Sequence, residues 1–268
     1  MAFKLCLNTS TIKPVPLMEK VRLVADAGFS GIELWINDVY EFVGQGGEVS
    51  DLIKLLADRG LKVPNCIAVR GWGEADDFEY PMQLEDIKRR MELAARLGSP
   101  SIVATPPRMP TDLAQITRRY ADLLKVGRSV GVKPLMEYIS FLKSVYTLEQ
   151  CWQVVRDCGE PDAVLIPDAF HTWNGPGDPD LLTKIPVKYI AHYHFDDAPA
   201  GKPPGTQTDP DRVMPGDGVI DLHAEVRRLK QIGYTGWVSL ELFNRELWAK
   251  DPREVLKIGM ERMRKYFG

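Results

Sequence analysis

Residues 26–34, "DAGFSGIEL", decide the fold, because they join the end of an amphipathic helix to a buried strand through a glycine turn. The same arrangement recurs in "ARLGSPSIV" (95–103) and in "KQIGYTGWVSL" (230–240). Apolar residues at three- and four-residue steps precede each glycine, which is a common helix stop. The apolar run after each turn is typical of a parallel strand covered on both faces. The repeat therefore predicts an α/β protein built from helix–turn–strand units.

Eight strand-like runs alternate with helix-like runs along the 268 residues. The runs span residues 3–8, 31–35, 62–69, 101–106, 132–138, 163–169, 189–195 and 237–243. Eight units without a linker or a low-complexity segment favour one domain over residues 1–268, a closed (β/α)8 TIM barrel, over a doubly wound sheet. The helix after Asp168 is expected to be short. Residues 196–220 form a long Pro/Gly/Asp loop, and such loops are usually functional.

The composition excludes several classes of protein. With 34 basic and 37 acidic residues the net charge is −3, which gives no sign of a nucleic-acid surface. No signal peptide and no membrane span is expected. The four cysteines show no CxxC spacing, which favours reduced thiols in a cytoplasmic protein. The oligomeric state is left open, a homo-oligomer included.

Four acid or imidazole residues end apolar runs in the second half of the chain. They are Glu137 in "VKPLMEY", Asp168 in "AVLIPDAFH", His194 in "YIAHYHF" and Glu241 in "WVSLELF". A strongly polar side chain that closes a buried strand is costly unless something binds it. Two glutamates, an aspartate and a histidine are a typical ligand set for a divalent cation. Their spacing, about one per βα unit, predicts a metal site at the mouth of the barrel.

Further polar residues follow other strand-like runs. Glu33 ends the second run, where it could contact a substrate or form an ion pair inside the barrel. Arg70 and Arg108 follow the third and fourth runs and could bind an acidic substrate. Asp196 and Asp197 either support the ligands or cap the loop that they begin.

The strand ends "ME", "DAFH", "HYHFDD" and "LELF" resemble the xylose-isomerase-like TIM-barrel superfamily of sugar isomerases and epimerases. The resemblance is strongest in the last third, which looks like the inosose isomerases of inositol catabolism. "GIELWINDVYEF" and "ELFN" resemble the 3-dehydroshikimate dehydratases about as well. The resemblance implies that one divalent ion (Mn, Mg, Co or Zn) is held by four ligands, Glu137, Asp168, His194 and Glu241. It also implies that His171 and Arg212 contact the substrate.

These residues predict an isomerase or epimerase of carbohydrate metabolism that acts on a sugar or cyclic polyol ketone. A metal-stabilised enediolate would form when Glu137 or Glu241 removes the proton beside the carbonyl, and either glutamate could return it. His171 would donate to the oxyanion, and Arg212 would hold the substrate from the loop. The alternative is a lyase, 3-dehydroshikimate dehydratase. An endonuclease IV-type nuclease is disfavoured, because it would need more histidine ligands and a basic DNA face.

Overall fold

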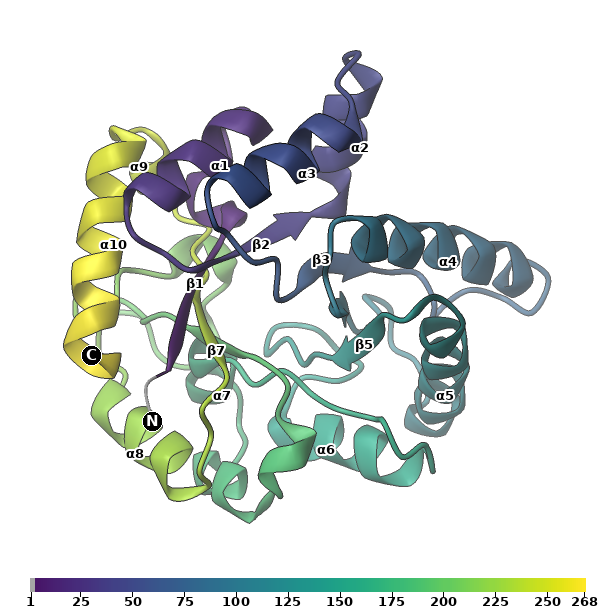
Figure 1. The fold of residues 1–268 in the computed structure, drawn as a ribbon. Coiled ribbons are helices and arrows are strands. Elements are labelled where there is room, and N and C mark those ends of the chain that lie inside the picture. The colour runs from purple at the N-terminus through teal and green to yellow at the C-terminus, as the bar shows by residue number, and fades with distance from the viewer. Residues whose placement is uncertain (1–2) are drawn as a thin grey trace.

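Seven parallel strands form one curled sheet in the computed structural model, which describes residues 3–268 (Figure 1). The strands are β1 (Lys4–Asn8), β2 (Gly31–Trp35), β3 (Cys66–Val69), β4 (Ser101–Ala104), β5 (Lys133–Met136), β6 (Tyr193–Phe195) and β7 (Trp237–Leu240). Their order across the sheet is β5-β4-β3-β2-β1-β7-β6. Seven of the eight predicted runs are thus strands, although most are shorter than predicted.

The remaining run, the sixth in chain order at residues 163–169, closes the barrel without forming a regular strand. Leu165 pairs with Met136 on one side and with Ile190 on the other, and Asp168 pairs with His194. The segment therefore lies between β5 and β6, the two edges of the sheet. Pro167 has no amide hydrogen to donate to a ladder, which explains why only isolated bridges form here. The prediction of a (β/α)8 TIM barrel is confirmed, with one strand position filled by bridges.

Helices surround the strands on the outside of the barrel (Figure 1). They are α1 (Leu17–Asp26), α2 (Ile36–Gly44), α3 (Val49–Asp58), α4 (Tyr80–Arg96), α5 (Leu113–Val130), α6 (Leu148–Asp157), α7 (Ala169–Asn174), α8 (Leu222–Gln231), α9 (Arg245–Trp248) and α10 (Pro252–Phe267). Short 3-10 helices lie at Thr9–Ile12, Pro179–Lys184, Val187–Tyr189 and Asp209–Asp211. The helix after Asp168, α7, has six residues, as short as predicted. No helix within residues 3–268 is long and apolar enough to cross a membrane.

The barrel interior has an apolar side and a polar side. Strands β3, β4, β5 and the 163–169 segment contribute a small apolar cluster that includes Ile67, Val103, Leu135 and Ile166. Strands β1, β2, β6 and β7 instead bring buried polar side chains, Asn8, Glu33, His192, His194 and Ser239. Because successive residues of a strand point to opposite faces, the neighbours of these residues pack outward against the helices. The polar side continues upward into the mouth of the barrel.

Helix α5 packs closely on β5 at Gly127, and we expect this glycine to be required for stability. A Cβ atom at residue 127 would lie 2.3 Å from the Val132 carbonyl oxygen and 2.8 Å from Pro134 Cδ. Gly127→Ala should therefore lower the free energy of unfolding by about 1–3 kcal/mol, the usual cost of overpacking. Gly44→Ala is the matched control, because nothing lies within 4 Å of its Cβ position. Urea denaturation of both variants tests this, and equal stability would contradict it.

Candidate active site

Three of the four predicted metal ligands meet at the mouth of the barrel. Single ligand atoms of Asp168, His194 and Glu241 all lie within 4.8 Å of one another, and all three side chains are buried. Asp168 precedes α7 and caps it, accepting a hydrogen bond from the His171 amide at 2.8 Å. His194 lies in β6, and Glu241 directly follows β7. The carboxyl ends of neighbouring strands thus bring together residues far apart in the sequence.

The fourth predicted ligand, Glu137, follows β5 and opens onto the same cavity without joining that close group. The cavity has a volume of about 60 Å³. Its lining comprises Trp35, Ile67, Arg70, Thr105, Glu137, Ile139, His171, Asp209, Arg212, Glu241 and Phe243. Within residues 3–268 no hydrogen bond or ion pair reaches the Glu137 carboxylate. Burial, reinforced by the nearby Glu241, raises the pKa of Glu137 to about 8.

The pKa values of Glu241, Asp168 and His194 are shifted as well. Burial raises the pKa of Glu241 to about 7, against the opposing influence of His194 and Arg212. Burial also disfavours ionisation of Asp168, but Arg212, His171 and His194 together outweigh it, so the pKa of Asp168 is lowered. Burial lowers the pKa of His194, yet Glu241 and Glu33 outweigh it and raise this pKa to about 10. The site therefore attracts positive charge strongly.

The donor set fits a divalent cation. His194 Nδ1 is buried without a hydrogen-bond partner among the described residues. It lies 3.1 Å from Glu241 Oε2 and 3.8 Å from Asp168 Oδ2. Three carboxylates and one imidazole at neighbouring strand ends suit Mg²⁺, Mn²⁺ or Zn²⁺. Burial raises the pKa of two of those carboxylates, so a cation bound there would stabilise their ionised forms.

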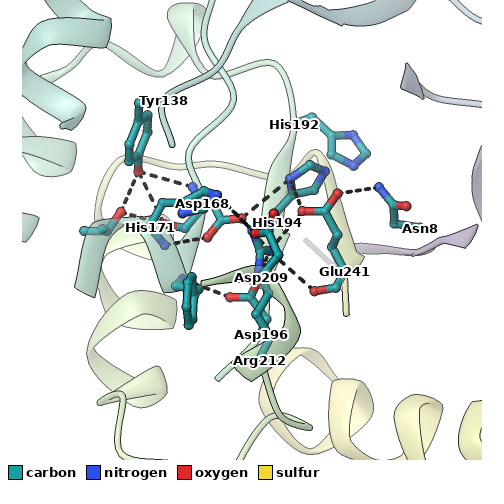
Figure 2. Close-up of polar contacts among 12 residues, drawn as sticks. Asn8, Tyr138, Asp168, His171, His192, His194, Asp196, Asp209, Arg212 and Glu241 are labelled. Carbon is teal, nitrogen blue, oxygen red and sulfur yellow. Dashed lines mark hydrogen bonds and ion pairs between the residues drawn. The ribbon is translucent and has the colours of Figure 1, made fainter. Parts of the chain in front are cut away.

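Arg212 reaches into the acidic group from the long loop. Its guanidinium is 1% exposed, and its Nη1 donates to Asp168 Oδ2 at 2.9 Å and to Glu241 Oε2 at 3.0 Å. The same Nη1 also donates to Asp196 (Figure 2). Asp196 thus helps to hold Arg212, while its predicted support of the ligands stays a prediction. The guanidinium compensates charge on the buried acids that surround it.

His171 lies on the other side of the guanidinium. Arg212 Nη2 donates to His171 Nε2 at 2.9 Å and to Asp209 Oδ1 at 2.7 Å. The His171 Nδ1 atom lies 3.1 Å from the Ser140 hydroxyl. Burial lowers the pKa of His171 to about 4, so the ring is neutral near pH 7 and accepts from Arg212. In this arrangement His171 orients Arg212, while its predicted donation to a substrate oxyanion stays a prediction.

The loop of residues 196–220 is held by two polar side chains. The Asp197 carboxylate accepts hydrogen bonds from the amides of Ala198, Gly216, Gly218 and Ile220. Asn174 Nδ2 donates to the Gln207 carbonyl, and Asn174 Oδ1 accepts from the Gly205 amide. Asp197 therefore caps the loop, and this ordered loop delivers Arg212 to the site.

Glu33 lies deeper than predicted from its place at a strand end. Its side chain is 0% exposed and does not line the cavity. Burial raises its pKa, but His192 and His194 outweigh burial, so the pKa of Glu33 is well below its usual value. Of the two roles considered for it, the ion pair inside the barrel is the one that this geometry displays.

Three residues of this network were not predicted from the sequence. Asn8 donates to both Glu33 and Glu241, Asn65 donates to Glu33, and Asp209 accepts from Arg212. Asn8 ends β1, so the rule that identified the four predicted ligands would have identified it. Asn65 directly precedes β3, and Asp209 lies in the long loop. Nothing in the local sequence separates these two from ordinary turn residues.

Comparison with known proteins agrees with this barrel. Residues 21–266 match the model of the family described as xylose isomerase-like TIM barrel. An inosose isomerase of Bacillus velezensis is 28% identical over 96% of this chain and 95% of that protein. A 3-dehydroshikimate dehydratase of Pseudomonas putida is 27% identical over 89% of this chain, but this chain spans only 38% of that protein. A crystal structure of the IolI protein with a bound zinc atom has a TM-score of 0.91 at 27% identity, covering 99% of this chain and 100% of that one.

The fold and the site together define a TIM-barrel enzyme with a cluster of acids and histidine at the carboxyl ends of its strands. The chain belongs to the xylose isomerase-like TIM barrel family. The resemblance inferred from the sequence is thereby confirmed, as is the prediction of an enzyme.

We expect metal binding to release protons and to strengthen as pH rises. Glu137 and Glu241, with pKa values raised to about 8 and about 7, hold protons near neutrality that a metal must displace. Affinity for Mn²⁺ should therefore be weak near pH 6 and increase through about pH 8. Isothermal titration calorimetry in two buffers of different ionisation enthalpy measures both the metal affinity and the number of protons released. An affinity that is constant over this range would contradict the assignment.

Proposed function

We propose that the protein is a divalent-metal-dependent isomerase of a sugar or cyclic polyol ketone, with an inosose as the favoured substrate. The proposal rests on the family, on relatives named inosose isomerase and on the donor set at the barrel mouth. Its partner is a small molecule, and a cytoplasmic location and a part in inositol catabolism remain predictions.

In this proposal Glu137, Asp168, His194 and Glu241 hold the cation. A divalent ion bound there would supply Lewis acidity to a substrate carbonyl and its neighbouring hydroxyl. The bound zinc of the similar IolI structure supports the cation, although it does not fix which metal this chain uses.

The observation that carries the proposal is the buried, unpartnered Glu137 carboxylate beside Glu241. A general base is most effective when its pKa lies near the working pH, and these two pKa values are raised to about 8 and about 7. Glu137 and Glu241 belong to different strand ends, after β5 and β7. One can therefore accept the proton beside the carbonyl while the other returns it, or one alone can move it between adjacent carbons.

Arg212 and His171 would orient the substrate. Arg212 lines the cavity, and its Nε–H has no hydrogen-bond partner among the described residues, which leaves a donor for a substrate oxygen. His171 holds the guanidinium through Nη2. The covering loop would exclude water from the proton transfer.

Substitution of the two glutamates tests their role. Glu137→Gln and Glu241→Gln should each lower kcat by about 10²-fold or more at saturating metal, since general-base catalysis contributes roughly 10²–10⁴-fold. Glu246→Gln is the matched control, because Glu246 is an exposed glutamate of α9 outside the cavity. Steady-state kinetics with metal content measured in parallel separates lost chemistry from lost metal. Two glutamine variants as active as the wild type would refute the proton-transfer assignment.

A second candidate function, dehydration of 3-dehydroshikimate, is favoured by Arg70. This arginine follows β3, lines the 60 Å³ cavity and stacks its guanidinium 5.2 Å from the Trp35 ring. No ion pair to Arg70 occurs within the described part of the chain. It also lines an adjoining pocket of about 280 Å³, together with Arg90. A free cation beside the cavity suits a substrate carboxylate, which 3-dehydroshikimate has and inososes lack.

Product analysis in D₂O distinguishes the two reactions. With an inosose or a simple ketose we expect deuterium at the carbon beside the carbonyl and an isomer formed without loss of water. Arg70→Met should leave the KM for a neutral ketone unchanged, because Arg70 would face only an anionic group. Arg118→Met, an exposed arginine of α5, is the control. If no ketone exchanges, and 3-dehydroshikimate yields protocatechuate with a KM that Arg70→Met raises, the dehydratase replaces the isomerase.

A further inference from the structure

The His194 imidazole lies between acids on both of its nitrogens. Its Nε2 is 3.3 Å from Glu33 Oε1 and 3.2 Å from Glu33 Oε2. Its Nδ1 faces the proposed ligands Glu241, at 3.1 Å, and Asp168, at 3.8 Å. An ionised carboxylate only accepts hydrogen bonds, so Nε2 must carry the hydrogen that faces Glu33. In the neutral imidazole that metal binding requires, the lone pair would then lie on Nδ1, on the side of Glu241 and Asp168.

The Glu33 carboxylate is held in one orientation by amide donors. Asn65 Nδ2 donates to Oε1 at 2.7 Å, and Asn8 Nδ2 donates to Oε2 at 3.3 Å. Asn65 is itself held by the Ser101 hydroxyl, which donates to its Oδ1 at 3.0 Å. All of these side chains are buried, so a rotation of the carboxylate would leave polar groups without partners.

Asn8 connects this buried carboxylate to a second proposed ligand. The same Nδ2 that reaches Glu33 donates to Glu241 Oε1 at 2.7 Å (Figure 2). Its Oδ1 accepts from the Trp35 indole at 2.9 Å, which fixes the orientation of the amide. One asparagine at the end of β1 thereby links the support of His194 to the position of Glu241.

We propose that Glu33 is a positioning residue that sets the tautomer and the ring orientation of His194 for metal binding, with Asn8 and Asn65 as its supports. This inference rests on the proposed metal site. It differs from the predicted substrate contact of Glu33 in a measurable way. A substrate contact would change KM and leave metal affinity alone, whereas the support of a ligating histidine changes metal affinity without any substrate present.

Metal titration of the full chain without substrate tests the proposal. Glu33→Gln should weaken Zn²⁺ and Mn²⁺ binding by about 10–100-fold, the usual effect of losing the hydrogen-bond partner of a ligating histidine. Glu225→Gln is the matched control, because Glu225 is a buried glutamate of α8 that accepts from Tyr193 at 2.7 Å, outside the ligand cluster. It should leave metal affinity unchanged. Circular dichroism of each variant establishes that it is folded.

A second measurement needs no substitution, so it stands even if Glu33→Gln does not fold. Two-bond ¹H–¹⁵N correlation spectra of ¹⁵N-histidine protein report which ring nitrogen carries the hydrogen in each of the four histidines. In the Zn²⁺-loaded wild type, His194 should carry it on Nε2. A hydrogen on Nδ1, or a folded Glu33→Gln variant with wild-type metal affinity and a raised KM, would overturn the proposal. A wild-type chain that binds no metal would instead refute the proposed function, and this inference with it.

Discussion

Burial of acidic groups around one guanidinium is the constraint on which the rest of this structure depends. Asp168, Asp196 and Glu241 all contact Arg212 Nη1, and the removal of such a partner leaves uncompensated buried charge. Asp168 and Glu241 lie at the carboxyl ends of the barrel segments, whereas Arg212 comes from the loop of residues 196–220, which Asp196 begins. The position of that loop is therefore coupled to the electrostatics of the site. Asp197 and Asn174 anchor this loop and thereby affect the position of Arg212, although neither residue lines the cavity.

Charge in the barrel is arranged in two layers. The upper layer, at the strand ends, has the acids of the proposed cation site, among them Glu137 and Glu241, whose pKa values are raised. The lower layer has Glu33, with a lowered pKa, between His192 and His194. His194 belongs to both layers, since its two nitrogens face different acids. The pKa values of Glu241 and Glu33 are thus shifted in opposite directions, because burial dominates for Glu241 and two imidazoles outweigh burial for Glu33.

The sequence predicts most of the fold and much of the site, for a reason visible in individual residues. Buried parallel strands must be apolar, so Glu137, Asp168, His194 and Glu241 stand out at their ends. The run at 163–169 was predicted as a strand, and only Pro167 signals that its ladder is interrupted. The depth of Glu33 could not be predicted, because depth depends on the register and tilt of β2 against its neighbours. Asn65 has its role because it contacts Glu33, which lies 32 residues away, and Asp209 has its role because the long loop brings its partner Arg212 to the site.

The different positions of the strand-end and loop residues also explain why both isomerisation and dehydration are compatible with this barrel. Isomerisation and dehydration both begin with removal of a proton beside a polarised carbonyl, and the residues proposed for that step, Glu137 and Glu241, follow strands β5 and β7. The two substrates differ in whether they carry a carboxylate. Arg70, which follows β3 and packs against Trp35, would contact that carboxylate in the proposed dehydration. Loop residues change more readily than strand ends that support a buried ionic network. Under the proposed function, specificity would therefore be decided at the rim of the barrel, while the strand ends would determine the first chemical step.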